Sequence, residues 1–166
     1  MKIKVQFFEE RLVDAVGAGV YEIYARTDDK EELFYVVYGV MNSMNARYFD
    51  VDNYVITAKD IKGPWSEPVY LHSSGFDASM LHDDDGRKWI VSLDWETRAG
   101  YEKPGAICLV EYSPEKKEII GYPKRIWHGG TDRGCIEAPH LYKRKGYYYI
   151  MCAEGGTGYG HSVTMG

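Results

Sequence analysis

The amino-acid sequence predicts an all-β fold, because a β-rich unit recurs along the chain. Short aromatic runs, each preceded by a polar turn, begin at residues 34, 88 and 147, which lie 54 and 59 positions apart. A second strand-like stretch follows each run. A period in the fifties is typical of the blades of a β-propeller. A plain β-sandwich, which also has short strands and regular turns, remains an alternative.

The elements of each unit follow from composition. Aspartate, lysine and glycine mark the turns, whereas valine, isoleucine, tyrosine and tryptophan favour the pleated surface of a strand. The expected strands are 34–39, 53–57 and 68–71, then 88–93, 106–112 and 123–127, then 147–152 and 161–165. Helical signals are weak throughout, and only the first sixteen residues could form a helical turn or two.

The number of units limits what this chain can form alone. The sequence holds two complete units and the opening strands of a third, whereas closed propellers have about four to eight blades. We therefore predict an incomplete piece of roughly two to three blades over residues 19–166. Residues 1–18 form an N-terminal segment for which the sequence predicts no definite structure.

Composition and charge exclude several classes of protein. The 166 residues are 45% hydrophobic and carry a formal charge of −5, which excludes disorder as the main state and argues against nucleic acid or an anionic membrane as the partner. No apolar run approaches the roughly 20 residues that a spanning helix needs. The start of the chain does not resemble a secretory signal, and Cys108, Cys135 and Cys152 suggest buried thiols in a reducing cytoplasm.

Two carboxylates stand in unusually apolar surroundings. Asp77 lies between Phe76 and Ala78, and Glu137 lies between an isoleucine and an alanine. They precede the aromatic runs of their units by 11 and 10 positions, so that successive blades would direct them toward one central cavity. A pair of acids there suits general acid catalysis with a raised pKa. The alternative is that each caps a turn or pairs with an arginine such as Arg87 or Arg133.

Several motifs carry a resemblance to a known family. Residues 76–91, FDASMLHDDDGRKWIV, and residues 63–70, GPWSEPVY, resemble the second-blade motifs of glycoside hydrolase family 43. Residues 137–143, 146–149 and 153–159 resemble its third-blade motifs. The resemblance is to the β-xylosidase and α-L-arabinofuranosidase members, and it extends from about Gly19 to the C-terminus.

This resemblance implies a five-bladed propeller that hydrolyses xylose- or arabinose-containing oligosaccharides with inversion. Glu137 matches the general acid that protonates the leaving oxygen, and Asp77 matches the carboxylate that orients the acid and tunes its pKa. The expected sugar-binding residues are Phe76, Trp95, Gly155, Gly156 and Thr157. No cofactor is expected. A calcium ion at the propeller centre is compatible with the family, but the sequence shows no ligand set for a metal.

One part of the family pattern is missing. Family members carry an aspartate general base near the start of the first blade, and no matching motif precedes Tyr21, since Asp14, Asp28 and Asp29 stand in other contexts. We therefore expect weak or no hydrolysis by the isolated chain. The alternative is a non-catalytic remnant that binds carbohydrate or a partner. Because open blades leave strand edges unpaired, we also expect self-association or pairing with a complementary fragment.

Overall fold

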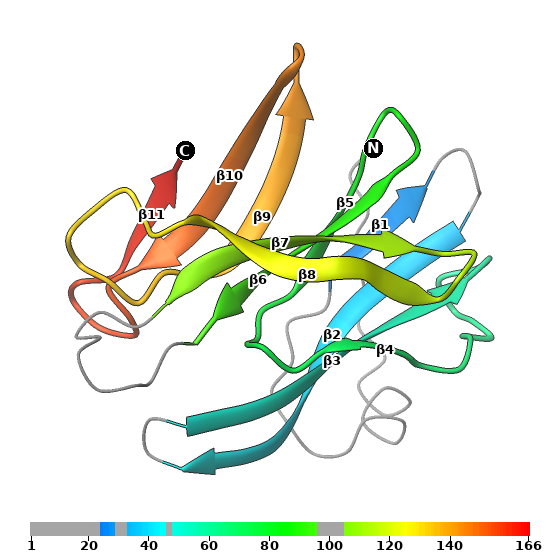
Figure 1. The fold of residues 1–166 in the computed structure, drawn as a ribbon, viewed down its shortest axis with the longest axis horizontal. Coiled ribbons are helices and arrows are strands. Elements are labelled where there is room, and N and C mark those ends of the chain that lie inside the picture. Colours follow the sequence, from blue (N-terminus) through cyan, green and yellow to red (C-terminus); the bar gives the residue numbers. More distant parts are fainter. Residues whose placement is uncertain (1–23, 29–32, 46–47, 96–104) are drawn as a thin grey trace.

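The structure, a computed structural model, confirms the all-β prediction. It describes residues 24–28, 33–45, 48–95 and 105–166. These residues form eleven strands in three antiparallel sheets (Figure 1). The described residues include no helix long and apolar enough to cross a membrane. The expected segment 1–18 lies outside the described residues.

Each sheet is a meander in which strands that follow one another in the chain lie side by side. Sheet A contains β1 (Tyr24–Asp28), β2 (Leu33–Asn45), β3 (Tyr48–Ala58) and β4 (Val69–His72). Sheet B contains β5 (Ser79–His82), β6 (Lys88–Asp94), β7 (Ala106–Ser113) and β8 (Glu118–Trp127). Sheet C contains β9 (Glu137–Arg144), β10 (Tyr147–Glu154) and β11 (Ser162–Met165). These are the repeated units of the sequence, each with one strand more at its beginning than the sequence pattern revealed.

The turn between β9 and β10 shows how local sequence sets the register. Lys145 and Gly146 have φ angles of 53° and 79°, and Arg144 pairs with Tyr147 across the turn. A two-residue hairpin loop with both φ angles positive matches the right-handed twist of the flanking strands. Glycine adopts this conformation without steric cost, so the Lys-Gly pair fixes where β10 begins.

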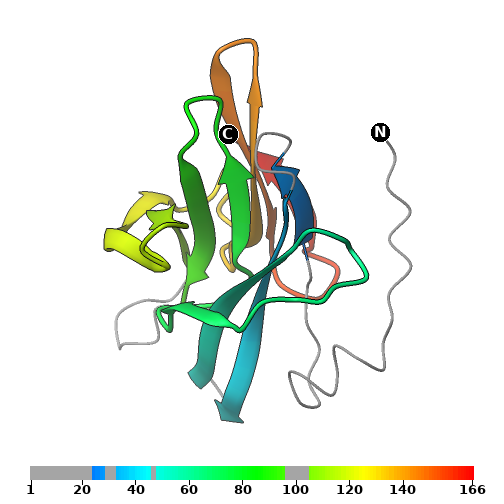
Figure 2. The ribbon, with the colours of Figure 1, turned by 90° about the vertical axis from the view of Figure 1, so that its right-hand side faces the viewer.

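Sheet B lies between the other two sheets (Figures 1 and 2), and its strands β5 and β6 are mostly buried, whereas β8 is largely exposed. Successive side chains of a strand point to opposite faces. Thus Met80 and Ile90 pack against sheet A, whereas Leu81 and Val91 pack against sheet C. A strand buried on both faces reads as a continuous apolar run rather than an alternating one, which explains the run from Trp89 to Val91 in the sequence.

A buried histidine links sheet A to the loop that leads into sheet B. His72, the last residue of β4, is 6% exposed, and its Nδ1 lies 3.1 Å from the Ser74 hydroxyl. Its Nε2 has no hydrogen-bond partner. Burial lowers the pKa of His72 to about 4, and the charge of Asp94 opposes this shift only in part. The imidazole is therefore neutral in the folded protein near neutral pH.

We predict that His72 makes the fold sensitive to acid. Its pKa is about 4 when folded and about 6.5 when unfolded, so the unfolded state binds the proton more tightly. The stability contributed by the neutral ring is complete above about pH 6.5 and is lost as pH falls toward 4, by up to about 3 kcal/mol. Chemical denaturation at several pH values should show a shallower fall in His72→Gln. The exposed His128 is the control, and an equal fall in His128→Gln and His72→Gln would contradict this assignment.

Candidate functional site

The two predicted acids lie at the starts of neighbouring strands in sheets B and C. Asp77 stands two residues before β5, and Glu137 is the first residue of β9. Both residues are half-buried, and β5 and β9 lie side by side. The packing of sheet B on sheet C therefore brings together two segments that are 60 positions apart in sequence.

Two hydrogen bonds join these acid-bearing segments directly. The backbone N–H of Ala138, the residue after Glu137, donates to Asp77 Oδ2 at 3.1 Å. The hydroxyl of Ser79 donates to the carbonyl oxygen of Pro139 at 2.6 Å. One oxygen of Asp77 is thus committed to the peptide that follows Glu137, which couples the position of one acid to the backbone of the other.

The backbone around both acids adopts uncommon conformations. Asp77, Cys135 and Ala138 have φ angles of 54°, 49° and 49°. A residue with a Cβ pays a steric cost in the left-handed region, of order 1–3 kcal/mol when the conformation is strained, and such residues persist where their surroundings fix them. These uncommon conformations, at Asp77 and on both sides of Glu137, make this part of the sheet B–sheet C junction a candidate functional site.

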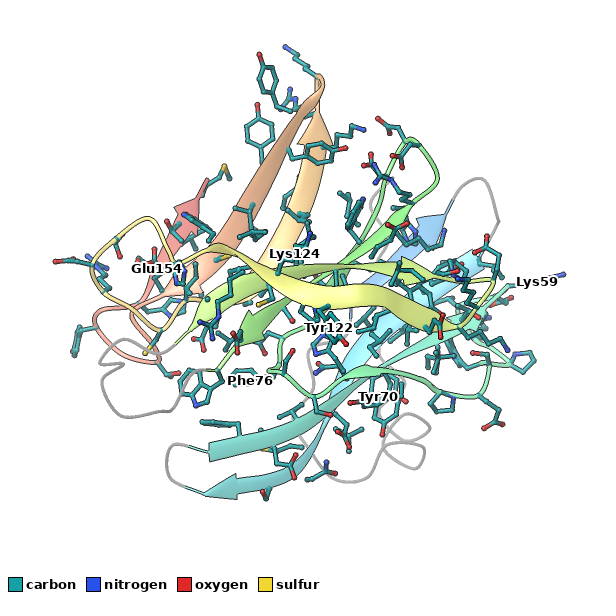
Figure 3. All side chains as sticks on the ribbon, viewed as in Figure 1. Lys59, Tyr70, Phe76, Tyr122, Lys124 and Glu154 are labelled. Carbon is teal, nitrogen blue, oxygen red and sulfur yellow. The ribbon has the colours of Figure 1, made fainter. Side chains whose placement is uncertain are left out.

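The predicted sugar-binding aromatics form a three-ring cluster beside the acids. The ring of Phe76 lies 5.6 Å from that of Trp95, measured between centroids. Phe49 of β3 lies 5.2 Å from each of them. All three rings are half-buried, and Figure 3 labels Phe76, the residue directly before Asp77. Nothing in the sequence pattern pointed to Phe49, since it stands in an ordinary strand and reaches the cluster only through the packing of sheet A.

The predicted glycine loop packs against the segment that leads to Glu137. The N–H of Gly155 donates to the carbonyl oxygen of Gly134 at 2.8 Å. The carbonyl oxygen of Gly156 lies 2.9 Å from His161 Nδ1, and Thr157 is exposed. Gly155 and Gly156 are therefore held within the protein, whereas the Thr157 side chain faces solvent.

A polar cluster on sheet A was not predicted from the sequence. Asp52 of β3 accepts hydrogen bonds from the Ser73 hydroxyl and from Asn42 Nδ2, the latter at 2.9 Å. The Ser73 hydroxyl also lies 2.7 Å from that of Tyr70. These hydrogen bonds lower the pKa of Asp52, Ser73 contributing most, so its carboxylate stays ionised. Strands β2, β3 and β4 of sheet A bring Asn42, Asp52 and Tyr70 together. The spacing of these residues along the sequence does not reveal the cluster.

Within the described part of the chain, neither a metal-binding cluster nor the apolar cavity described below includes the two acids. Among the described residues, no group of three or more histidine, cysteine, aspartate or glutamate side chains could hold a metal ion. A cavity of about 160 Å³ lies elsewhere, between sheets A and B, and its lining includes Tyr35, Val55 and Tyr112 but no carboxylate. We assign the site from the strained, hydrogen-bonded acids, since that cavity lacks the groups that acid catalysis requires.

Comparisons with known proteins show which family this chain resembles. The profile of Glycosyl hydrolases family 43 matches residues 25–166. Xylosidase/arabinosidase 43B of Humicola insolens is 47% identical over 134 residues, which are 81% of this chain and 25% of that protein. Beta-xylosidase of Bacillus subtilis (strain 168) is 44% identical over 132 residues, which are 80% of this chain and 25% of that protein. The chain thus spans about a quarter of the length of these curated relatives.

A solved structure shows the same arrangement of strands. The crystal structure of xylan beta-1,4-xylosidase from Bacillus halodurans C-125 superposes with a TM-score of 0.79 at 45% sequence identity. The match covers 87% of this chain and 28% of that one. The three sheets therefore correspond to one part of a larger protein.

We predict that Asp77 protects the peptide after Glu137 from solvent exchange. Asp77→Ala removes the acceptor of the Ala138 N–H, and amide hydrogen exchange at Ala138 should become about tenfold faster, the equivalent of one lost hydrogen bond. Asp77→Asn retains an acceptor oxygen and should exchange at nearly the original rate. Unchanged exchange at Ala138 in Asp77→Ala would show that this hydrogen bond does not hold the two segments together.

Proposed function

Because this chain belongs to glycosyl hydrolase family 43, we propose that it hydrolyses O-glycosidic bonds of xylose- or arabinose-containing oligosaccharides. The single observation that supports this is the hydrogen bond between Asp77 Oδ2 and the Ala138 N–H, which places an acid from sheet B against the peptide that follows an acid of sheet C. The enzymes of this family are five-bladed β-propellers, and the three sheets are a fragment of that propeller.

In the proposed mechanism Glu137 is the general acid. It gives its proton to the leaving glycosidic oxygen as the bond to the anomeric carbon breaks. Asp77 stays ionised, raises the pKa of Glu137 through its negative charge, and holds the Ala138 peptide. Phe76 and Trp95 contribute aromatic faces for a sugar ring, and Gly155, Gly156 and Thr157 border the proposed sugar-binding site. The reaction is inverting, with a water molecule attacking the opposite face of the sugar.

We further propose that this chain alone performs the reaction poorly. Inversion needs a general base roughly 6.5–9.5 Å from the acid, with room for water between them. No sequence motif before Tyr21 matches the family's base, and those residues lie outside the described part of the structure. The same feature favours the second candidate function, a non-catalytic remnant that binds carbohydrate or a partner chain.

The three cysteines support a further proposal about location. Cys108, Cys135 and Cys152 are all free thiols, and burial, with the charge of Asp94 acting in the same direction, raises the pKa of Cys108 to about 11. Protonated, buried thiols are stable in a reducing compartment. We propose that the chain works in the cytoplasm.

We predict that xyloside hydrolysis by the purified chain is slower than that of the Bacillus halodurans relative by about 10²- to 10⁴-fold, the usual contribution of a general base. The measurement is release of nitrophenol from aryl xylosides and arabinofuranosides, by the chain and by Glu137→Gln. Glu118→Gln, at an exposed position on β8, is the control. Residual hydrolysis that Glu137→Gln leaves unchanged would refute the role of Glu137. Turnover as fast as that of the relative would refute the impairment.

The outward face of sheet C, the face that points away from sheet B, supports the proposal that the chain pairs with a complementary fragment. In sheet B the pair Met80–Ile90 faces back to sheet A, and the neighbouring pair Leu81–Trp89 faces forward to sheet C. In sheet C the corresponding backward pair, Leu141–Ile150, is buried against sheet B.

The forward pair of sheet C is partly exposed, and so are two neighbouring side chains of β11. Tyr142 and Tyr149 are 41% and 38% exposed, and Val163 and Met165 on β11 are 70% and 61% exposed. Because the repeat places a further sheet at this position, we propose that the outward face of sheet C binds a fragment that carries another blade.

We predict that the outward face of sheet C binds the part of the Bacillus halodurans relative that this chain does not match. Without that segment, the chain should self-associate through the same face. Sedimentation velocity should detect the complex, and Val163→Glu or Met165→Glu should weaken it because a charge would be buried unpaired. Tyr122→Glu is the control, since Tyr122 is 88% exposed on β8. A stable monomer that does not bind the complementary segment would contradict the proposal.

A further inference from the structure

Glu154 is a fully buried carboxylate that the proposed reaction does not use. It is the last residue of β10 and has 0% of its surface exposed. An ionised carboxylate inside a protein costs several kcal/mol unless hydrogen bonds compensate for the lost water. Within the described part of the chain, Glu154 forms no salt bridge with an arginine or lysine, and its hydrogen-bond partners are backbone N–H groups.

Those partners belong to the loop that leads to Glu137. The N–H of Gly130 donates to Glu154 Oε2 at 3.1 Å, and the N–H of Thr131 donates to Oε1 at 3.4 Å. Figure 3 shows Glu154 at the end of β10, beside the loop that follows β8. Each carboxylate oxygen therefore holds one peptide of the segment between β8 and β9.

The shape of this loop fits closely around the carboxylate. A Cβ on Gly129, whose φ is 112°, would lie 2.2 Å from Glu154 Oε1, and a Cβ on Gly130 would lie 2.3 Å from Thr164 Oγ1. A side chain at either position would require the loop, Glu154 or Thr164 to shift. The two glycines and the buried carboxylate thus form one fitted contact.

Two other contacts attach the same loop to the connection between β10 and β11. Gly134 accepts a hydrogen bond from the N–H of Gly155 at 2.8 Å. Arg133 Nη1 donates to the carbonyl oxygen of Gly160 at 2.7 Å. At its far end, Glu137 is in register with Ala153, the residue before Glu154. The loop is held at its start, middle and end by residues 153–160.

We propose that Glu154 is a positioning residue for Glu137, which it controls by fixing the backbone of residues 129–136. This inference rests on the proposed role of Glu137 as the general acid. A general acid must lie within hydrogen-bond reach of the leaving oxygen, and a displacement of about 1 Å is enough to lower a rate by about 10²-fold. Glu154 acts without touching the sugar, because its two side-chain oxygens accept hydrogen bonds from the N–H groups that set the path of the loop.

The test compares Glu154→Gln with a matched control, Asp83→Asn. Asp83 is a second buried carboxylate of the sheet B–sheet C interface. Its partners are Lys143 and Tyr148, which lie near the opposite end of the β9–β10 hairpin. The control therefore shows what loss of a buried carboxylate does to stability without disturbing the loop around residues 129–136.

Two readouts that need no turnover separate positioning from general stability. Glu154→Gln keeps one acceptor oxygen and replaces the other with an NH2 group, so amide exchange should be about tenfold faster at whichever of Gly130 and Thr131 loses its acceptor. The titration midpoint of the Glu137 carboxyl, followed by carbon NMR, should move by about half a pH unit or more. Asp83→Asn should lower the melting temperature but change neither readout. Glu154→Asp keeps the charge and shortens the reach by one methylene, so it should fall between the wild-type chain and Glu154→Gln.

Unchanged exchange at Gly130 and Thr131 together with an unchanged Glu137 titration in Glu154→Gln would overturn the inference. Equal changes in Asp83→Asn would overturn it too, because they would report only general loosening. If Glu154→Gln does not fold, Glu154→Asp decides by the same two readouts. A failure of the proposed function is seen separately, as hydrolysis that Glu137→Gln leaves intact, and it does not depend on the outcome for Glu154.

Discussion

The contact between sheets B and C is the interaction on which the candidate site depends. Its centre is apolar, with Leu81 and Val91 packed against Leu141 and Ile150. At one end, hydrogen bonds from the Ala138 N–H and the Ser79 hydroxyl join the acid-bearing segments. The apolar contact supplies non-directional attraction, whereas the hydrogen bonds fix the register of β5 against β9. Without this contact Asp77 and Glu137 would belong to two separate hairpins.

Two buried carboxylates reinforce this contact in different ways. Burial disfavours the charge of Asp83, but hydrogen bonds from Lys143 and Tyr148 outweigh that effect and keep the pKa of Asp83 below its ordinary value. Glu154 instead receives its hydrogen bonds from backbone N–H groups of the loop before Glu137. The first carboxylate ties sheet B to the tip of the β9–β10 hairpin, and the second ties the connecting loop to sheet C. A buried carboxylate is costly when its hydrogen-bond donors are removed. Each carboxylate therefore favours the arrangement of strands and loop that supplies those donors.

The three sheets differ in how their outer faces are covered, and this difference relates the fold to the length of the chain. The outer face of sheet A buries Val36 and Tyr38, with Trp65 of its own β3–β4 connection packed against them. The outer face of sheet C exposes Tyr149 and Met165. The chain spans about a quarter of the length of its curated relatives, and the sheets at the two ends of this span differ in the exposure of their outer faces.

The sequence by itself determined the strand-rich repeat, the family and the two acids, because these depend on local composition and on motifs within a few residues. It did not reveal β5 and β9 as strands, since β5 has only four residues and β9 contains Pro139 and charged side chains. The sequence pattern did not point to Phe49 or Asp52, and it placed Glu154 within a family motif without indicating its contact with the loop before Glu137. Their roles come from contacts between strands distant in the sequence, and only the tertiary structure decides which side chains of different sheets meet, because sheet packing and burial act across space rather than along the chain.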